Sequence, residues 1–113
     1  MAILGKNAIL SAEDFEYALV PCPEWGGDVR VRGLSAADQA FIAKLSEQGK
    51  KDILTLTVFV RGVVGEDGER IFTASDMDDL KGRSFAVVER VAKKIIELTS
   101  PGDADAVDKL QKN

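Results

Sequence analysis

Hydrophobic and polar positions alternate with period two in two short stretches near the start of the chain, "EYALV" (Glu16–Val20) and "DVRVR" (Asp28–Arg32). This alternation predicts two β-strands, each with one buried and one solvated face. The intervening "PCPEWGG" carries the prolines and glycines of a turn. We therefore expect a β-hairpin over residues 15–33, with the valines of its second strand on one face and the arginines on the other.

Apolar residues at three- and four-residue steps predict helices further along the chain. The first helix is expected over residues 36–48. Ser35, directly before it, is the N-cap, and Gly49, directly after it, ends the helix. The clearest amphipathic pattern covers residues 84–99. Residues 52–64 are ambiguous, because the apolar spacing fits a buried helix while the many β-branched side chains fit a strand. Their length without a turn signal favours a helix.

Shorter elements are expected on either side of these helices. Asp67 and Gly68 predict a tight turn, followed by an extended "RIF" and a brief acidic helix capped by Thr73 or Ser75. At the beginning of the chain, Ser11 has the spacing of a helix cap, so we expect either one helical turn or a loose arm there.

Together these patterns predict an α+β fold that is mainly α, with the N-terminal β-hairpin packed on a small bundle of three to four helices. A chain of 113 residues is long enough for one domain with a modest core. The expected parts of this single domain, residues 1–113, are an arm over 1–14, the hairpin over 15–33, a helical body over 34–100, and a short C-terminal helix or frayed tail over 101–113.

Charge and cysteine content narrow the possible partners. The chain has 19 acidic and 15 basic residues, a net charge of −4, so it lacks the positive surface that nucleic-acid binding requires. No stretch approaches the roughly 18 apolar residues of a spanning helix, so we expect no membrane partner. The single cysteine, Cys22, fits a reducing compartment such as the cytoplasm.

Candidate catalytic and metal-binding residues are few, because the chain has no histidine. Cys22 stands between two prolines without a recognisable base, which argues against a nucleophile. The acidic cluster of Asp76, Asp78 and Asp79 is better explained as a helix start than as a metal site, and Glu66–Glu69 lacks the spacing of a calcium loop. We therefore expect a protein that is not an enzyme and that binds no cofactor and no metal.

Trp25, the only tryptophan, has two interpretations. The indole either folds back over the helices as part of the core, or it serves as a rigid anchor for a protein partner, a role in which Trp is over-represented. The apolar helix faces also exceed what so small a body must hide internally, which indicates an interface. The candidates for partner binding are Trp25, Phe41, Leu45, Phe59 and Phe85.

Several motifs occur in a characteristic order. "PEWGG" is followed by "VRVRGLSAAD", then by the turn "GEDGER" leading to "IFT" and an acidic helix, and finally by the amphipathic helix that ends "IIELTS". In this order and composition the sequence resembles the tail assembly chaperones of long-tailed bacteriophages and related prophages, over nearly the whole chain. The "GEDGER" turn and the cysteine between prolines depart from the usual pattern.

The resemblance implies a function for the chain. Such a chaperone acts in the host bacterial cytoplasm, binds the tape measure protein, keeps it soluble and recruits tail tube protein, and is absent from the mature virion. Weak self-association between copies is expected if many of them coat one long partner. A ribosomal frameshift near the end of the reading frame commonly yields a longer product in that family.

Three other classes of function remain open. A structural virion protein, such as a tail or head–tail connector subunit, would share the acidic α+β composition, as would another small protein-binding adaptor. A small enzyme using Cys22 or the acidic cluster is the remaining alternative.

Overall fold

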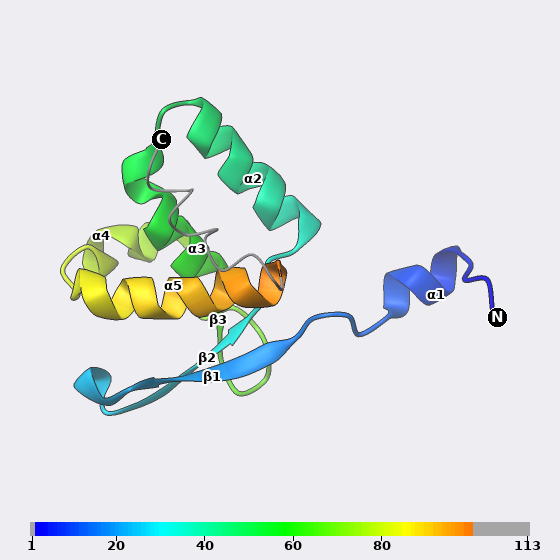
Figure 1. Cartoon of the computed structure of the whole chain (residues 1–113), viewed down its shortest axis with the longest axis horizontal. Helices are drawn as coiled ribbons and strands as arrows, with labels where there is room; N and C mark the ends of the chain where they lie inside the picture. The colour runs from blue at the N-terminus through cyan, green and yellow to red at the C-terminus, as the bar shows by residue number, and fades with distance from the viewer. Residues whose placement is uncertain (1, 101–113) are drawn as a thin grey trace.

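A computed structural model describes residues 2–100, which form a small antiparallel sheet, helices packed on it, and an N-terminal arm (Figure 1). The elements follow in the order α1 (Lys6–Ser11), β1 (Tyr17–Cys22), the 3₁₀ turn η1 (Pro23–Trp25), β2 (Gly27–Arg32), α2 (Ala36–Glu47), η2 (Lys51–Ile53), α3 (Leu54–Gly62), β3 (Val63–Val64), η3 (Ala74–Asp76), α4 (Met77–Leu80) and α5 (Phe85–Thr99). The mainly helical α+β fold predicted from the sequence is confirmed.

The predicted hairpin is formed by β1 and β2. The two strands are antiparallel, with Tyr17 opposite Arg32 and Cys22 opposite Gly27. The tip is the 3₁₀ turn η1, which ends at Gly26 with a φ of 86°. A side chain at this left-handed position would be strained, so the glycine allows the chain to reverse here.

The hairpin continues into a three-stranded sheet that the sequence did not predict. We expected a helix over 52–64, but α3 ends at Gly62 and the next two residues form β3. This strand pairs antiparallel with β2, placing Val63 opposite Val31. β2 otherwise has a free edge, and two β-branched residues can fill it while remaining buried. Tertiary pairing thus overrides the helical pattern at its last two positions.

Three helices form the main body. α5 packs against β1 and β2 and also against α3, while α2 packs against α3 (Figure 1). α3 is the most enclosed of the three, since seven of its nine residues are buried. The buried apolar residues form one core cluster: Val20, Cys22, Val31, Leu34, Ile42, Leu45, Leu54, Val58, Phe59, Val60, Val63, Leu80, Val87, Val88, Val91, Ala92, Ile95 and Ile96.

The N-terminal arm lies outside this body. α1 has no buried residue, and Figure 1 shows it extending beyond the root of the hairpin. The expectation that Ser11 caps a following helix is wrong. Ser11 is the last residue of α1, and its hydroxyl donates a hydrogen bond of 2.8 Å back to the carbonyl of Asn7. The next residue, Ala12, is extended, so no helix begins there.

The segment between β3 and α5 matches the predicted turn and acidic helix. The amide of Gly65 donates to the carbonyl of Glu69 at 2.9 Å, which closes the turn. At the start of η3, the amide of Thr73 donates to the carboxylate of Asp76 at 2.8 Å. The predicted C-terminal helix or tail over 101–113 lies outside the described residues.

Candidate protein-docking groove

A groove of about 690 Å³ opens between the hairpin tip and the segment that leads into α4. Such a volume is typical of sites that hold a small ligand or a few large side chains. Its lining comes from the hairpin tip η1, the strands β2 and β3, the helix α3, and the segment from Ile71 to Arg83. The lining residues, hereafter the groove, are Trp25, Asp28, Val29, Arg30, Phe59, Val63, Val64, Ile71, Phe72, Asp76, Asp79, Leu80 and Arg83.

Aromatic contacts hold Trp25 at the edge of this groove. The indole meets the ring of Phe59 edge to face, with centroids 6.0 Å apart and planes at 90°. Phe59 in turn packs on Phe72 at 5.6 Å. Trp25 is 37% exposed while Phe59 is buried. The indole therefore has a packed side and a free side, and a role of the free side as a partner anchor stays a prediction.

An ion pair fixes the hairpin tip that carries Trp25. The guanidinium of Arg90 on α5 donates to both carboxylate oxygens of Glu24, at 2.9 and 2.7 Å, and also to the carbonyl of Pro21 at 3.2 Å. These hydrogen bonds lower the pKa of Glu24 to about 2 and raise the pKa of Arg90. The two-pronged contact restricts the orientation of η1, and with it the position of the indole.

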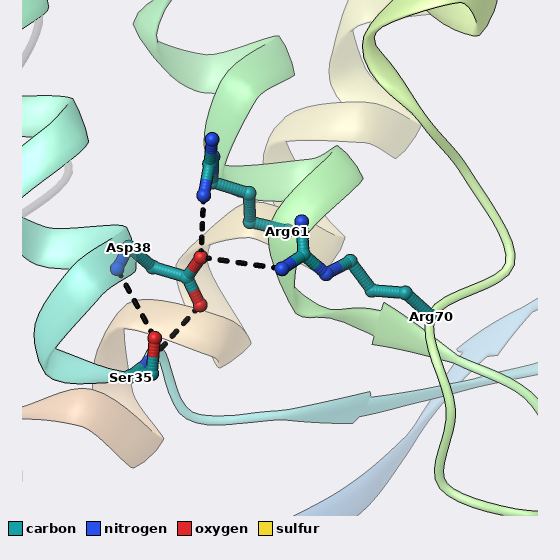
Figure 2. A network of polar contacts seen from close by, with 4 residues as sticks. All are labelled: Ser35, Asp38, Arg61 and Arg70. Atoms are coloured by element: carbon teal, nitrogen blue, oxygen red, sulfur yellow. Dashed lines mark hydrogen bonds and ion pairs between the residues drawn. The ribbon is translucent and has the colours of Figure 1, made fainter.

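The opposite wall of the groove is tied to α2 by a buried carboxylate (Figure 2). Asp38 completes a capping box with Ser35, and its carboxylate accepts a hydrogen bond of 2.7 Å from Arg61 of α3. Arg70, directly before Ile71 of the groove, lies 3.7 Å from the same carboxylate oxygen. Burial alone would raise the pKa of Asp38, but the hydrogen bonds from Arg61 and Ser35 outweigh burial and lower the pKa.

The lining of the groove carries charges of both signs beside its apolar side chains. Three carboxylates, from Asp28, Asp76 and Asp79, line it together with two guanidinium groups. One of these, Arg30, is already engaged, because it donates to the carbonyls of Gly65 and Glu66 at 3.3 and 2.7 Å. Asp76 is engaged in the same way by the amide of Thr73, so the lining has only a small excess of negative charge.

The structure separates the five residues predicted to bind a partner. Trp25 and Phe59 meet at the groove, whereas Phe41 and Leu45 line a smaller hollow of about 210 Å³ elsewhere. Phe85, at the start of α5, lies in neither and is 59% exposed.

Burial corrects two of these candidates. Leu45 and Phe59 belong to the core, because the helix stripes on which they lie pack against neighbouring elements of the chain. They are not available to a partner in this conformation. Phe41 is 43% exposed and has the guanidinium of Arg61 over its ring at 3.9 Å.

The sequence reasoning missed several of the exposed apolar residues. Ile71 lines the groove and is 56% exposed, and the arm carries four exposed large hydrophobics: Ile3, Leu4, Ile9 and Leu10. The apolar surface available to a partner therefore includes the arm and Ile71 of the groove, in addition to the exposed Phe41 and Phe85. In the sequence, these residues were indicated only by being apolar within segments that show no helical or strand periodicity.

The residues weighed above as a nucleophile or as metal ligands take part in structural contacts. Cys22 is buried, and burial raises the pKa of its thiol. Asp76 accepts the Thr73 amide, and Asp78 pairs with Lys81 at 3.3 Å. Within residues 2–100, no three His, Cys, Asp or Glu side chains are placed to share a metal ion. None of the helices in that range has the length and apolar character needed to cross a membrane.

Comparison with known proteins gives a match in structure alone. No protein-family model matches the chain, and no curated protein matches its sequence. Among solved structures, the bacteriophage HK97 tail assembly chaperone superimposes with a TM-score of 0.67 over 86% of this chain and 95% of that one, at 18% identity. The resemblance indicated by the order of motifs is thus confirmed in three dimensions, and the chain has the fold of a bacteriophage tail assembly chaperone.

Proposed function

We propose that this protein is a phage tail assembly chaperone, which binds the tape measure protein, keeps it soluble and helps to recruit tail tube subunits. The observation that carries the proposal is the fold shared with the HK97 chaperone over nearly the full length of both chains. Fold alone does not define function, so the surface must also suit the role. The exposed apolar side chains and the acidic charge described above meet that requirement.

The physical basis of the activity is the covering of apolar surface. A long helical partner exposes apolar stripes that aggregate in water, and an acidic protein that packs on them replaces the stripe with a charged surface. Trp25, Phe41 and Phe85 remain candidate contacts, because each is a large aromatic side chain with at least a third of its surface exposed. This role requires no bond to be made or broken.

The proposed site of action is the host bacterial cytoplasm during tail assembly, with the protein absent from the finished virion. Weak self-association lets several copies act on one long partner. Mass spectrometry of purified particles separates this role from that of a structural subunit. A chaperone is missing from the particles, whereas a tail or connector subunit is present in stoichiometric amount.

Co-expression with the tape measure protein tests the proposal directly. We expect the chain alone to keep that protein in the soluble fraction and to co-purify with it. Replacing Trp25, Phe41 or Phe85 in turn with Ser identifies the contacts, since a binding residue lowers co-purification while the variant still folds. Leu19→Ser is the matched control, because Leu19 is 61% exposed but lies on another surface. Failure of the unmodified chain to solubilise the tape measure protein would contradict the proposal.

A further inference from the structure

The outer edge of the sheet, along β1, has backbone groups without a partner strand. The strand order is β1-β2-β3, so within residues 2–100 β1 pairs with β2 alone. In an antiparallel pair, every second residue turns its N–H and C=O toward the neighbouring strand, and the others turn them outward. The amide of Gly33 donates to the carbonyl of Glu16 at 3.2 Å, so Glu16 and every second residue after it bond to β2. The backbone polar groups of Tyr17 and Leu19 therefore face outward.

The half of this edge nearer the hairpin tip is closed. Pro21 has no N–H, and its carbonyl already accepts a hydrogen bond of 3.2 Å from Arg90 of α5. Proline on an edge strand is a common way of preventing pairing with another chain. In the described part of the chain, neither feature is present at Tyr17 or Leu19, whose side chains are 38% and 61% exposed. Residues 17–19 thus form a short open edge.

Positive charge lies beside the open edge. β1 and α5 together line a hollow of about 380 Å³, and its charged side chains are three cations and one acid, Arg90, Lys93, Lys94 and Glu97. Arg90 already pairs with Glu24, and Lys94 lies 3.4 Å from Glu97. Lys93 pairs with no acidic side chain of the residues that the structure describes. In a chain with a net charge of −4, this local excess of positive charge favours an acidic partner.

The two faces of β1 determine which side chains an added strand must carry. Its side chains point to the same faces of the sheet as those of the β1 residues opposite them. Residues opposite Tyr17 and Leu19 lie on the exposed face, where apolar side chains gain contact with Leu19. The alternate residues lie on the face that packs against α5, beside Lys93 and Lys94. A strand in which apolar and acidic residues alternate is therefore complementary to the open edge.

We propose that the open edge binds an extended segment of another protein, with alternating apolar and acidic residues, as a fourth strand of the sheet. The segment exchanges backbone hydrogen bonds with Tyr17 and Leu19, and its acidic side chains contact the two lysines of α5. The N-terminal arm of another copy does not fit, because residues 2–12 carry Lys6 and no acidic residue. The edge is separate from the aromatic contacts proposed for the tape measure protein, so binding here goes beyond the proposed function.

NMR titration of the full chain with a synthetic peptide tests this binding. The probe is an octapeptide of alternating valine and glutamate, capped at both ends. Chemical shifts report even weak binding, and we expect the amide signals of Tyr17 and Leu19 to shift and their hydrogen exchange to slow as the peptide is added. A peptide with lysine in place of glutamate should bind about tenfold more weakly or less. Absence of any shift with the glutamate peptide overturns the proposal.

Charge reversal on α5 separates this surface from general attraction by charge. Lys93→Glu with Lys94→Glu should weaken binding of the glutamate peptide by about tenfold or more. Lys44→Glu with Lys50→Glu is the matched control, since both side chains are exposed and the net charge changes equally, but neither lines the hollow. The spectrum of each variant also shows directly that it is folded. Equal weakening by the two double variants would contradict binding at this edge.

Methylation of the peptide amides tests strand pairing itself. The valines of the probe lie opposite Tyr17 and Leu19, so their amides point toward β1 while those of the glutamates point away. N-methylation of the valines should abolish binding, whereas N-methylation of the glutamates should leave most of it. Equal binding of the two methylated peptides would show that the segment is held by its side chains alone, and it overturns the proposed pairing.

Hydrogen exchange without peptide identifies any other occupant of the open edge. We expect the amides of Tyr17 and Leu19 to exchange rapidly in the unliganded chain at every protein concentration. Slow exchange in dilute protein would mean that the chain covers its own edge, and exchange that slows with concentration would mean that a second copy covers it. Either result overturns the proposal. The co-expression test of chaperone activity depends on other residues, so its outcome is independent of this one.

Discussion

Gly62, the last residue of α3, lies directly against Ile95 of α5, with no room for a side chain between them. A β-carbon at Gly62 would lie 2.5 Å from both the Cδ1 and the Cγ2 atoms of Ile95. Because carbon atoms essentially never approach so closely, the glycine sets the separation of the two helices. The same residue ends α3 and precedes β3, so the contact also fixes where the chain leaves the helix for the sheet.

Gly62→Ala is expected to destabilise the protein. The added methyl group must displace Ile95, which is fully buried, and we expect the free energy of unfolding to fall by about 1–3 kcal/mol in urea denaturation. Gly27→Ala is the control, since a β-carbon there meets nothing within 4 Å. In the double variant Gly62→Ala, Ile95→Ala the methyl group has space, so the two effects should be clearly less than additive. Strict additivity would show that the contact is not responsible.

Asp38→Ala should be among the most damaging single substitutions at a polar residue. It removes the capping box of α2 and leaves Arg61, which is 22% exposed, without its carboxylate partner. We expect a loss of about 3 kcal/mol in the free energy of unfolding, measured by chemical denaturation. Asp78→Ala removes an equal charge from a pair whose carboxylate is 93% exposed. It should change stability by no more than about 0.5 kcal/mol.

The Glu24–Arg90 pair makes stability depend on pH in the acidic range. The pKa of Glu24 is about 2 in the folded protein and 4.5 without its partners, so the unfolded chain takes up a proton at higher pH than the folded one. The stabilisation is fully present above pH 4.5 and is lost as the pH falls towards 2. We expect Glu24→Gln to flatten the decline of the melting temperature over that range. Glu47→Gln, which removes an exposed carboxylate from α2, should leave the decline unchanged.

Cys22 should react slowly with thiol reagents while the protein is folded. Its side chain is inaccessible, and burial raises the pKa of the thiol, so both access and the thiolate fraction are reduced. We expect labelling by a maleimide, followed by mass spectrometry, to accelerate by orders of magnitude in denaturant. In a Cys22→Ser background, Ala12→Cys supplies an exposed thiol that should react at once. Equal labelling rates at the two positions would contradict the buried environment.

Trp25→Ala should lower stability less than truncation of a fully buried tryptophan would. A buried indole would contribute about 3 kcal/mol, whereas an indole that packs only one side on Phe59 should contribute about 1–2 kcal/mol. Thermal and urea denaturation measure this directly. Trp25→Phe keeps an aromatic edge near Phe59 and should restore part of the loss. A loss of 3 kcal/mol or more would favour the core interpretation of Trp25 over the anchor.

Local patterns predicted the elements that depend on local forces. The alternating valines and arginines identified β2, and the apolar stripe over 84–99 identified α5 almost to the residue. Ser35 was correctly predicted as the cap of α2. The same reasoning was wrong at Ser11, because the spacing of a cap also occurs by chance at the end of a short helix.

Elements that depend on distant partners were not predictable in this way. Val63 and Val64 continue the helical pattern of α3, yet they pair with β2 because that strand lies beside them in the folded chain. The groove has the same origin, since the hairpin tip and Ile71 are brought together only by the packing of the intervening helices. The sequence indicated the cap at Ser35, but not the contacts of Asp38 with Arg61 and Arg70.

By itself, the sequence determined that the chain forms a hairpin followed by helices, because hydrophobic periodicity and capping act over a few residues. Its order of motifs also indicated the tail assembly chaperone fold. Which apolar residues are buried and which are exposed depends on tertiary packing. Phe59 and Phe85 are the same type of residue, but Phe59 is enclosed by the neighbours of α3, while Phe85 remains exposed to water. Burial depends on what packs opposite a side chain, and that is settled only when distant segments meet.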